Sequence, residues 1–190
     1  MIADEWLERT RQAVAEYVPR RLEYGESTPA AILILVYDRC GEAHLLFTKR
    51  THQVEHHKGQ ISFPGGARDE GDETLEITAL RETGEEIGVN PEDIDIIGQL
   101  DDMLTISNFC VTPYVGILRT NSEYEFRVNS HEVDQVVQVP LAHLLDDKNM
   151  ELEVRQYKGK QVLVPAYTYE EHHIWGATAR MLRQFLELLT

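Results

Sequence analysis

Residues 65–89 read GGARDEGDETLEITALRETGEEIGV, and this stretch predicts a glycine-containing loop followed by a helix. Asp72 and Glu73 suit an N-cap and an acidic first turn, because carboxylates bind the free N–H groups at a helix start. Gly88 suits the helix end, since glycine readily adopts the left-handed conformation that terminates a helix. We therefore expect a helix from about Asp72 to Gly88, entered directly from the glycine loop.

The expected helix has two different faces at 100° per residue. The face expected to pack comprises Ile77, Leu80, Gly84 and Ile87, and the opposite face comprises Thr78, Glu82, Glu85 and Glu86. Carboxylates this close repel one another, and each raises its neighbours' pKa unless a cation lies between them. Hard oxygen ligands suit Mg²⁺ or Mn²⁺, which take further ligands from water and substrate phosphates. The pattern indicates a metal site formed by the three glutamates, against the alternative of a solvated acidic face.

Residues 81–89, RETGEEIGV, resemble the second half of the Nudix box. The pattern of that box is Gly-x5-Glu-x7-Arg-Glu-U-x-Glu-Glu-x-Gly-U, with an apolar residue at U. Two features depart from it. Thr83 stands at the first U, and Gly66 lies one residue too early for a first glutamate at Glu73. A one-residue insertion in the intervening loop would produce this spacing, so the box occupies about residues 66–89.

The resemblance to the Nudix family implies an α/β fold, an α/β/α sandwich around a mixed β-sheet. It also implies metal-dependent hydrolysis of a diphosphate linked to another group, with the metal held by the box glutamates. Arg81 is then expected to orient the box by pairing with Glu73. Glu85 and Glu132 are both candidates for the group that accepts the proton from water, because in this family a glutamate outside the box sometimes reaches the metal.

Two further stretches, LFTKRT at 46–51 and GQISFPGG at 59–66, resemble an additional signature of the coenzyme A pyrophosphatase subfamily. Thr51 replaces a small residue of that signature, and Glu55 replaces an arginine. The resemblance implies cleavage of coenzyme A or an acyl derivative into 4′-phosphopantetheine and adenosine 3′,5′-bisphosphate. The alternatives are another diphosphate substrate such as ADP-ribose, a nucleoside triphosphate, a non-catalytic Nudix domain that senses a ligand, and an acidic metal-buffering protein.

The segment 51–60 leads to the glycine pair, and we expect it to face the substrate. Cationic side chains in and beside it can contact phosphate oxygens, and bare glycine backbone can approach the same group. The predicted substrate-binding residues are Lys49, Arg50, Lys58, Gly65, Gly66 and Arg68. The same segment contains His52, His56 and His57, but no cysteine accompanies them in the spacing of a structural zinc site.

The size and charge of the chain limit its class. Its 190 residues fit one domain with a sizeable core, and no apolar run is long enough to span a membrane. Cys40 and Cys110 stand alone, which is typical of reduced thiols in a cytoplasmic protein. A net charge of −15 argues against nonspecific nucleic-acid binding, which depends on basic residues. The expected partner is a small-molecule diphosphate, and a homodimer is compatible with the sequence.

The remaining elements follow from hydrophobic periodicity. An apolar stripe that includes Val18 predicts a helix over residues 3–18. Strands are expected over residues 31–36, 44–49, 94–100, 109–118 and 133–139, followed by a short helix at 141–145. Pro113 predicts an edge or bulged position for its strand. Residues 151–157 and 161–169 predict a hairpin, and a helix is expected from about Trp175. This order of strands and helices is typical of an α/β sandwich.

Overall fold

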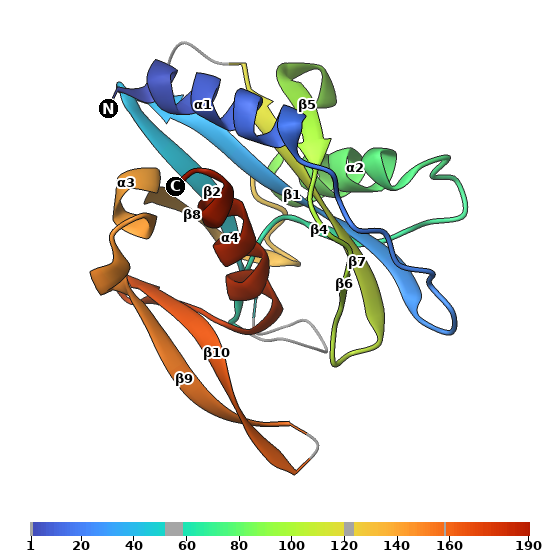
Figure 1. The fold of residues 1–190 in the computed structure, drawn as a ribbon. Coiled ribbons are helices and arrows are strands. Elements are labelled where there is room, and N and C mark those ends of the chain that lie inside the picture. Colours follow the sequence, from blue (N-terminus) through green and yellow to red (C-terminus); the bar gives the residue numbers. More distant parts are fainter. Residues whose placement is uncertain (1, 52–58, 120–123, 158) are drawn as a thin grey trace.

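A computed structural model describes residues 2–51, 59–119, 124–157 and 159–190. Its central sheet is mixed and has the strand order β3-β2-β1-β7-β5 (Figure 1). These strands are β1 (Thr28–Arg39), β2 (Glu42–Arg50), β3 (Ile61–Ser62), β5 (Ile94–Gln99) and β7 (Phe109–Leu118). Three more strands join the sheet, namely β4 (Gly65–Ala67) on β1, β6 (Met103–Leu104) on β7 and β8 (Val133–Pro140) on β2. Only the β1–β7 pair is parallel among the described pairs.

Strand β1 is buried on both faces, as its continuous apolar sequence predicts. Because side chains alternate along a strand, Ile34 and Val36 enter one hydrophobic cluster, whereas Leu33 and Leu35 enter another. The first cluster is covered by α1 (Ala3–Glu16) and α4 (Gly176–Leu188), and the second by α2 (Leu75–Ile87). The expected α/β/α sandwich is therefore confirmed.

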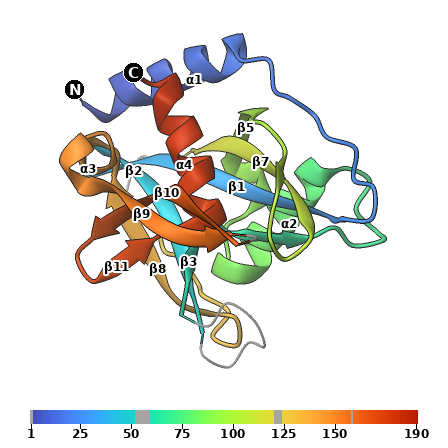
Figure 2. The ribbon, with the colours of Figure 1, turned by 60° about the horizontal axis from the view of Figure 1, so that its bottom comes forward.

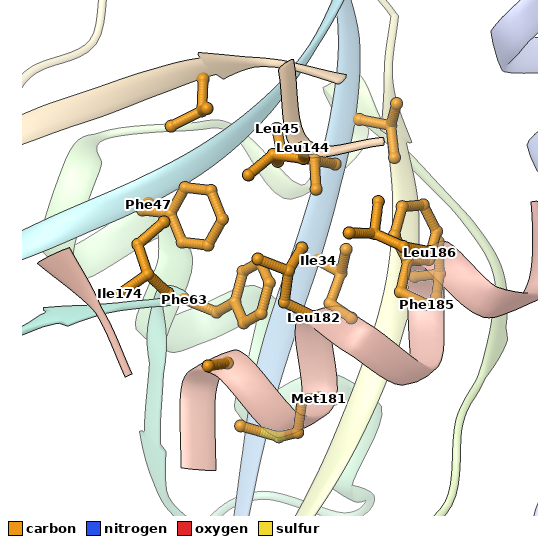
Figure 3. Packing of buried hydrophobic residues seen from close by; sticks show 14 of the residues in the cluster. Ile34, Leu45, Phe47, Phe63, Leu144, Ile174, Met181, Leu182, Phe185 and Leu186 are labelled. Carbon is orange, nitrogen blue, oxygen red and sulfur yellow. The ribbon is translucent and has the colours of Figure 1, made fainter. Parts of the chain in front are cut away.

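The larger cluster lies between the sheet and α4. Phe47 of β2 stacks on Phe63 with ring centroids 4.6 Å apart, and Leu182 and Phe185 of α4 are fully buried in the same cluster (Figure 3). Phe63 lies in the segment between β3 and β4, immediately before the glycine loop. The core therefore holds one end of that loop in place.

The C-terminal part forms a second, three-stranded sheet with the order β11-β10-β9. Its strands are β9 (Met150–Tyr157), β10 (Lys160–Tyr169) and β11 (His172–Ile174), and it follows the short helix α3 (Leu141–Leu144). This sheet packs against α4 (Figure 2), and the far end of the β9–β10 hairpin extends away from the main body (Figure 1). The hairpin and the final helix expected from the sequence are confirmed. Two short 3-10 helices, Pro91–Asp93 and Asp147–Asn149, complete the described elements.

The first helix is shorter than expected, because α1 ends at Glu16 and not at residue 18. Tyr17 is already extended, and Val18 is 87% exposed instead of packed. Pro19 explains the early end, since a residue before proline is sterically disfavoured in the helical conformation. Within the described residues, no helix has the length and apolar character needed to cross a membrane.

The sequence predicts an edge or a bulged position for Pro113, and the edge position is wrong because its strand is interior, while the β5–β7 pairing contains a register shift between Ile96 and Gly98. Its strand β7 has β1 on one side and β5 with β6 on the other. The pairing with β5 ends at Tyr114, the pairing with β6 begins at Val111, and Pro113 falls at the break between them. The Pro113 carbonyl still accepts a hydrogen bond from the Leu100 N–H at 2.8 Å. The missing proline N–H thus removes no bond from a regular ladder.

Candidate active site

Helix α2 begins at a cap that differs from the expected one. Thr74 is the N-cap, and its side-chain oxygen accepts a hydrogen bond from the Ile77 N–H at 3.2 Å. The Asp72 carboxylate instead accepts bonds from the Asp69 N–H at 3.1 Å and the Thr78 hydroxyl at 2.9 Å. Gly88 ends the helix in the left-handed conformation, with φ 70°, as predicted. Asp72 therefore stabilises the turn formed by residues 69–72 and links it to the first turn of the helix.

The face of α2 that packs on the sheet also differs from the expected one. Ile77 is 40% exposed, whereas Thr78 is fully buried. Hydroxyl groups tolerate this burial because they bond locally: Thr78 donates to Asp72, and Thr83 donates to the Ala79 carbonyl at 2.7 Å. The buried residues of the helix are Leu75, Thr78, Ala79, Thr83, Glu86 and Ile87. One carboxylate, that of Glu86, is thus carried into the interior on the packed face.

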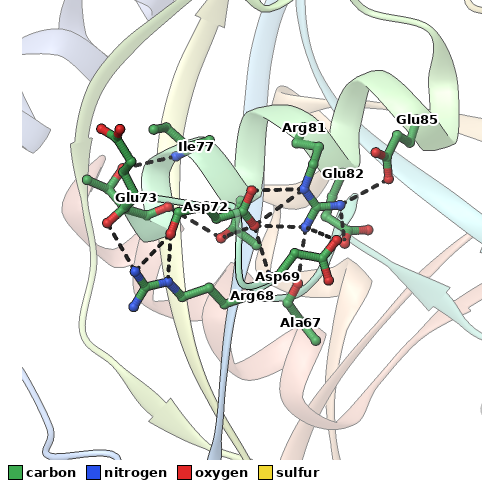
Figure 4. A network of polar contacts seen from close by, with 11 residues as sticks. Ala67, Arg68, Asp69, Asp72, Glu73, Ile77, Arg81, Glu82 and Glu85 are labelled. Atoms are coloured by element: carbon green, nitrogen blue, oxygen red, sulfur yellow. Dashed lines mark hydrogen bonds and ion pairs between the residues drawn. The ribbon is translucent and has the colours of Figure 1, made fainter.

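Arg81 connects the loop to the helix (Figure 4). Its guanidinium donates to the Asp72 carboxylate at 2.9–3.3 Å, to Glu82 at 2.9 Å and to Glu85 at 3.0 Å. A further bond reaches the Ala67 carbonyl at 3.2 Å. The hydrogen bonds from Arg81 hold the pKa of the buried Asp72 carboxyl far below its usual range, and Asp72 in turn raises the pKa of Arg81.

The expected partner of Arg81 was Glu73, and this expectation is wrong. Asp72 occupies the first acidic position of the box when the spacing is counted forward from Gly66, instead of backward from Arg81. The extra residue therefore lies between Asp72 and Arg81 and not in the loop before the acid. Sequence reasoning missed Asp72 as a site residue, although this forward count was the signal that could have identified it.

Arg68, a predicted substrate ligand, braces the same loop. Its Nε and Nη2 donate to the Asp72 carbonyl at 3.0 and 2.8 Å, and Nη2 also donates to the Glu73 carbonyl at 3.1 Å. These bonds hold the turn that leads into α2. A contact between Arg68 and substrate stays a prediction.

Glu86 is the buried acid of the site, with 2% of its surface exposed. Its Oε2 accepts a hydrogen bond from the Gly65 N–H at 3.3 Å, and its Oε1 lies 3.8 Å from Nη1 of Arg50. Burial raises the pKa of Glu86 to about 8, against the opposing effect of Arg50. The charges of Glu82 and Glu132 raise it further. Glu86 is therefore a carboxylate held where a negative charge is unfavourable without a cation.

Glu82 lies against the bare backbone of the glycine loop. A Cβ atom on Gly66 would lie 2.6 Å from the Glu82 carboxylate, closer than any side chain can approach. Burial raises the pKa of Glu82, and the charges of Glu85 and Glu132 add to this effect while Arg81 opposes it. The Glu82 carboxylate can occupy this position only because residue 66 is a glycine.

Glu132, the residue immediately before β8, affects the charge of Glu82 and Glu86. Its negative charge raises the pKa values of both Glu82 and Glu86. The connection to the substrate segment is direct, because the Thr51 N–H donates to the Glu132 carbonyl at 2.9 Å. Glu85, in contrast, has 58% of its side chain exposed and points to Arg81. Glu132 thus affects both Glu82 and Glu86, whereas Glu85 affects Glu82 and shares the Arg81 guanidinium with it.

The donor set fits a divalent cation of the hard type. Two carboxylates have pKa values raised by burial and by neighbouring glutamates, and one of them, that of Glu82, lies against the Gly66 backbone. A cation between them would remove the mutual repulsion, and oxygen ligands are those that Mg²⁺ and Mn²⁺ prefer. Within the described residues, the three side chains whose ligand atoms all lie within 4.8 Å of one another are Glu170, Glu171 and His172, at the β10–β11 turn.

The other predicted contacts are only partly described. Lys49 and Arg50 follow each other at the end of β2, with Lys49 Nζ 3.8 Å from the Asp134 carboxylate. Lys58, Glu55 and the three histidines of the segment lie outside the described residues. Gly65 and Gly66 form β4 together with Ala67, antiparallel to β1, so their backbone is held by the sheet.

Together, a mixed sheet between helices and two glutamates facing a glycine strand, one buried and one half-buried, define an α/β domain built around a carboxylate site. The NUDIX domain profile matches residues 27–159 of the chain. The chain therefore belongs to the Nudix family, as residues 81–89 indicated.

Two relatives have names that agree with this assignment. The mitochondrial Nudix hydrolase 15 of Arabidopsis thaliana is 34% identical over 158 residues, which are 80% of this chain and 55% of that protein. The uncharacterized Nudix hydrolase NudL of Cronobacter sakazakii is 37% identical over 156 residues, which are 82% of this chain and 79% of that protein. The chain spans about half the length of the plant relative. The family expected from the sequence is thus confirmed.

Two solved structures share the fold. The MutT protein of Methanosarcina mazei Go1 has a TM-score of 0.52 at 17% identity, covering 92% of this chain and 96% of that one. The Deinococcus radiodurans protein DR0079 has a TM-score of 0.53 at 15% identity, covering 83% of this chain and 82% of that one. At such identities the likeness extends to the fold alone.

Replacing Asp72 by asparagine should lower the free energy of unfolding by about 2–3 kcal/mol, because Arg81 loses its buried ionic partner. The carboxyl pKa is depressed in the folded state, so its stabilisation is complete above the unfolded value of about 3.9. It is lost as the pH falls through the lower, folded-state value. Measured by urea unfolding, the difference in unfolding free energy between wild type and Asp72→Asn should be constant from about pH 5 to about pH 8. It should disappear only in strong acid.

The control is Asp69→Asn. Asp69 lies 3.8 Å from Arg81 but has 73% of its side chain exposed, so this change should cost no more than about 0.5 kcal/mol. Equal destabilisation by the two substitutions would contradict the central role of Asp72.

Gly66→Ala should weaken Mn²⁺ binding by about tenfold or more, because the new methyl group displaces the Glu82 carboxylate. Isothermal titration calorimetry on the folded variant measures this change. Gly71→Ala is the matched control, since a Cβ at position 71 meets nothing within 4 Å. The same Mn²⁺ affinity in both variants would exclude Glu82 from the metal site.

Proposed function

We propose that the protein hydrolyses the diphosphate linkage of a small molecule, with Mg²⁺ or Mn²⁺ held by Glu82 and Glu86. The observation that carries this proposal is the buried Glu86 carboxylate, whose raised pKa and closeness to Glu82 call for a cation. Diphosphate chemistry needs little beyond positioning and charge neutralisation, so a metal held by carboxylates is sufficient machinery. Membership of the Nudix family supports the same reaction class.

The chain's own residues have distinct tasks in this reaction. A bound divalent metal supplies Lewis acidity to the diphosphate and lowers the pKa of a coordinated water. Arg81 orients Glu82 by a direct hydrogen bond and keeps it facing Gly66. Arg50, next to Glu86, offers its remaining N–H groups to the phosphate oxygens.

Glu132 is the proposed acceptor of the proton from the attacking water. Its negative charge raises the pKa of both Glu82 and Glu86. Glu85 was the other candidate, but its carboxylate is largely exposed and engaged with Arg81 at 3.0 Å. Glu85 is better suited to hold Arg81 in place, or to accept a hydrogen bond from a water on the metal.

We propose coenzyme A or an acyl derivative as the substrate. The support is the match of residues 46–51 and 59–66 to the subfamily signature, together with where these segments lie. Lys49 and Arg50 end β2, where Arg50 lies beside Glu86 and Lys49 beside Asp134, and residues 61–67 form β3, β4 and the segment between them. The 3′-phosphate of coenzyme A adds negative charge at a distance from the diphosphate, and Lys49 is the proposed contact.

Glu86→Gln should lower kcat at saturating Mg²⁺ by roughly a hundredfold or more, because several kcal/mol of transition-state stabilisation depend on the metal. Glutamine keeps the size and the hydrogen bond to Gly65, so the fold should persist by circular dichroism. Glu76→Gln, an exposed change on the same helix, serves as the control with unchanged kcat. Near-normal turnover by Glu86→Gln would remove this helix from the mechanism.

The preference for coenzyme A over its 3′-dephospho form should be about 10- to 150-fold in kcat/KM, the worth of one charge-assisted phosphate contact. Lys49→Met should reduce this ratio without changing kcat/KM for the dephospho form. Product masses identify 4′-phosphopantetheine. Equal rates for the two substrates, with faster cleavage of ADP-ribose, would overturn the coenzyme A proposal and leave the broader hydrolase proposal standing.

A further inference from the structure

The β9–β10 hairpin presents an apolar face to solvent beyond the core. Val154 of β9 lies directly opposite Leu163 of β10, and Leu152 lies on the same face of the hairpin. These side chains are 58%, 63% and 49% exposed in that order. At the base of the hairpin the same face continues into the core through Met150 and Tyr167, which pair with each other. The exposed apolar residues are thus an extension of a packed surface.

The hairpin also has an open edge. Within the described residues β9 pairs with β10 alone, so every second residue of β9 turns its N–H and C=O groups away from the sheet. Beyond β11, which pairs only with residues 167–169 of β10, the hairpin has two strands (Figure 1). Two-stranded ribbons are marginally stable in water, and open edges readily pair with another strand. A further strand along β9 would stabilise the two-stranded ribbon and pair its open edge.

The charges of β9 determine which strand fits. An antiparallel pairing of β9 with its own copy, centred on Val154, places Glu153 opposite Arg155 of the second copy and the reverse. Centring on Glu153 or on Arg155 would instead place two like charges opposite each other on the symmetry axis. In the isolated chain Glu153 and Arg155 form an ion pair with each other. In the dimer each would pair with its counterpart from the second copy, so the number of paired charges would stay the same.

Local charge also favours self-association at this place. The whole chain carries −15, which repels a second copy. Residues 150–163 contain two glutamates, one arginine and two lysines, a balance of +1. The hairpin is therefore a part of the surface where two copies approach without strong repulsion.

We propose that β9 is a homodimerisation edge, on which a second copy of this chain pairs antiparallel about Val154. The result is a continuous ladder of β10, β9 and their two counterparts, with the apolar faces joined at Val154. The interface is isologous, because the same residues contribute from both copies. It is independent of the proposed reaction, since none of its residues belongs to the carboxylate site.

Sedimentation velocity of the full chain at tens of micromolar tests this proposal. Wild type should sediment as a dimer of twice 21.8 kDa. Val154→Lys should raise the dimer dissociation constant by about tenfold or more, because the change occurs twice in each interface. Ile106→Lys is the matched control, since Ile106 is 87% exposed on a different loop and should leave the dimer intact. Melting temperature and circular dichroism verify that both variants fold.

Charge reversal provides a second test of the register. Glu153→Arg and Arg155→Glu should each weaken the dimer, and the double exchange should restore it. A monomeric wild type, a dimer that Val154→Lys leaves unchanged, or a double exchange that fails to restore association would each overturn the proposal.

Discussion

The buried ion pair between Asp72 and Arg81 is the interaction on which the site depends. Asp72 has little access to water, and its two oxygens are fully used by Arg81, Thr78 and the Asp69 N–H. Breaking such a pair leaves an unpaired buried charge, which is costly. One guanidinium therefore sets the position of the loop, the start of α2 and the orientation of the glutamates that follow it.

The carboxylate site uses this rigid support to hold groups that repel each other. Glu86 is buried against the Gly65 N–H, and Glu82 faces Gly66 at a distance that no side chain at position 66 would allow. Both pKa values are raised, so the folded protein keeps acids where their ionised forms are unfavourable. Binding of a divalent cation to such a site is favoured because it relieves the repulsion between the carboxylates. The sheet and the core around Phe63 supply the rigidity that this arrangement requires.

Much of the fold follows from sequence, and the fine structure of the site follows only in part. The apolar run of β1 and the alternation in β9 and β10 predict their strands, because local periodicity and burial agree there. The box motif identifies Glu82 and Glu86. The face of α2 that packs could not be predicted, because Thr78 is buried by a hydroxyl bond to Asp72, a contact that periodicity does not encode. The exposed position of Glu85 and its shared contact with Arg81 are likewise tertiary features that the motif does not encode.

The most direct measurement is anomalous diffraction from crystals of the full chain grown with Mn²⁺. The account predicts a manganese peak between Glu82 and Glu86, beside Gly66, at about 2.0–2.3 Å from one oxygen of each carboxylate. A peak found only at Glu170, Glu171 and His172, or no peak at the α2 glutamates at saturating Mn²⁺, would contradict it.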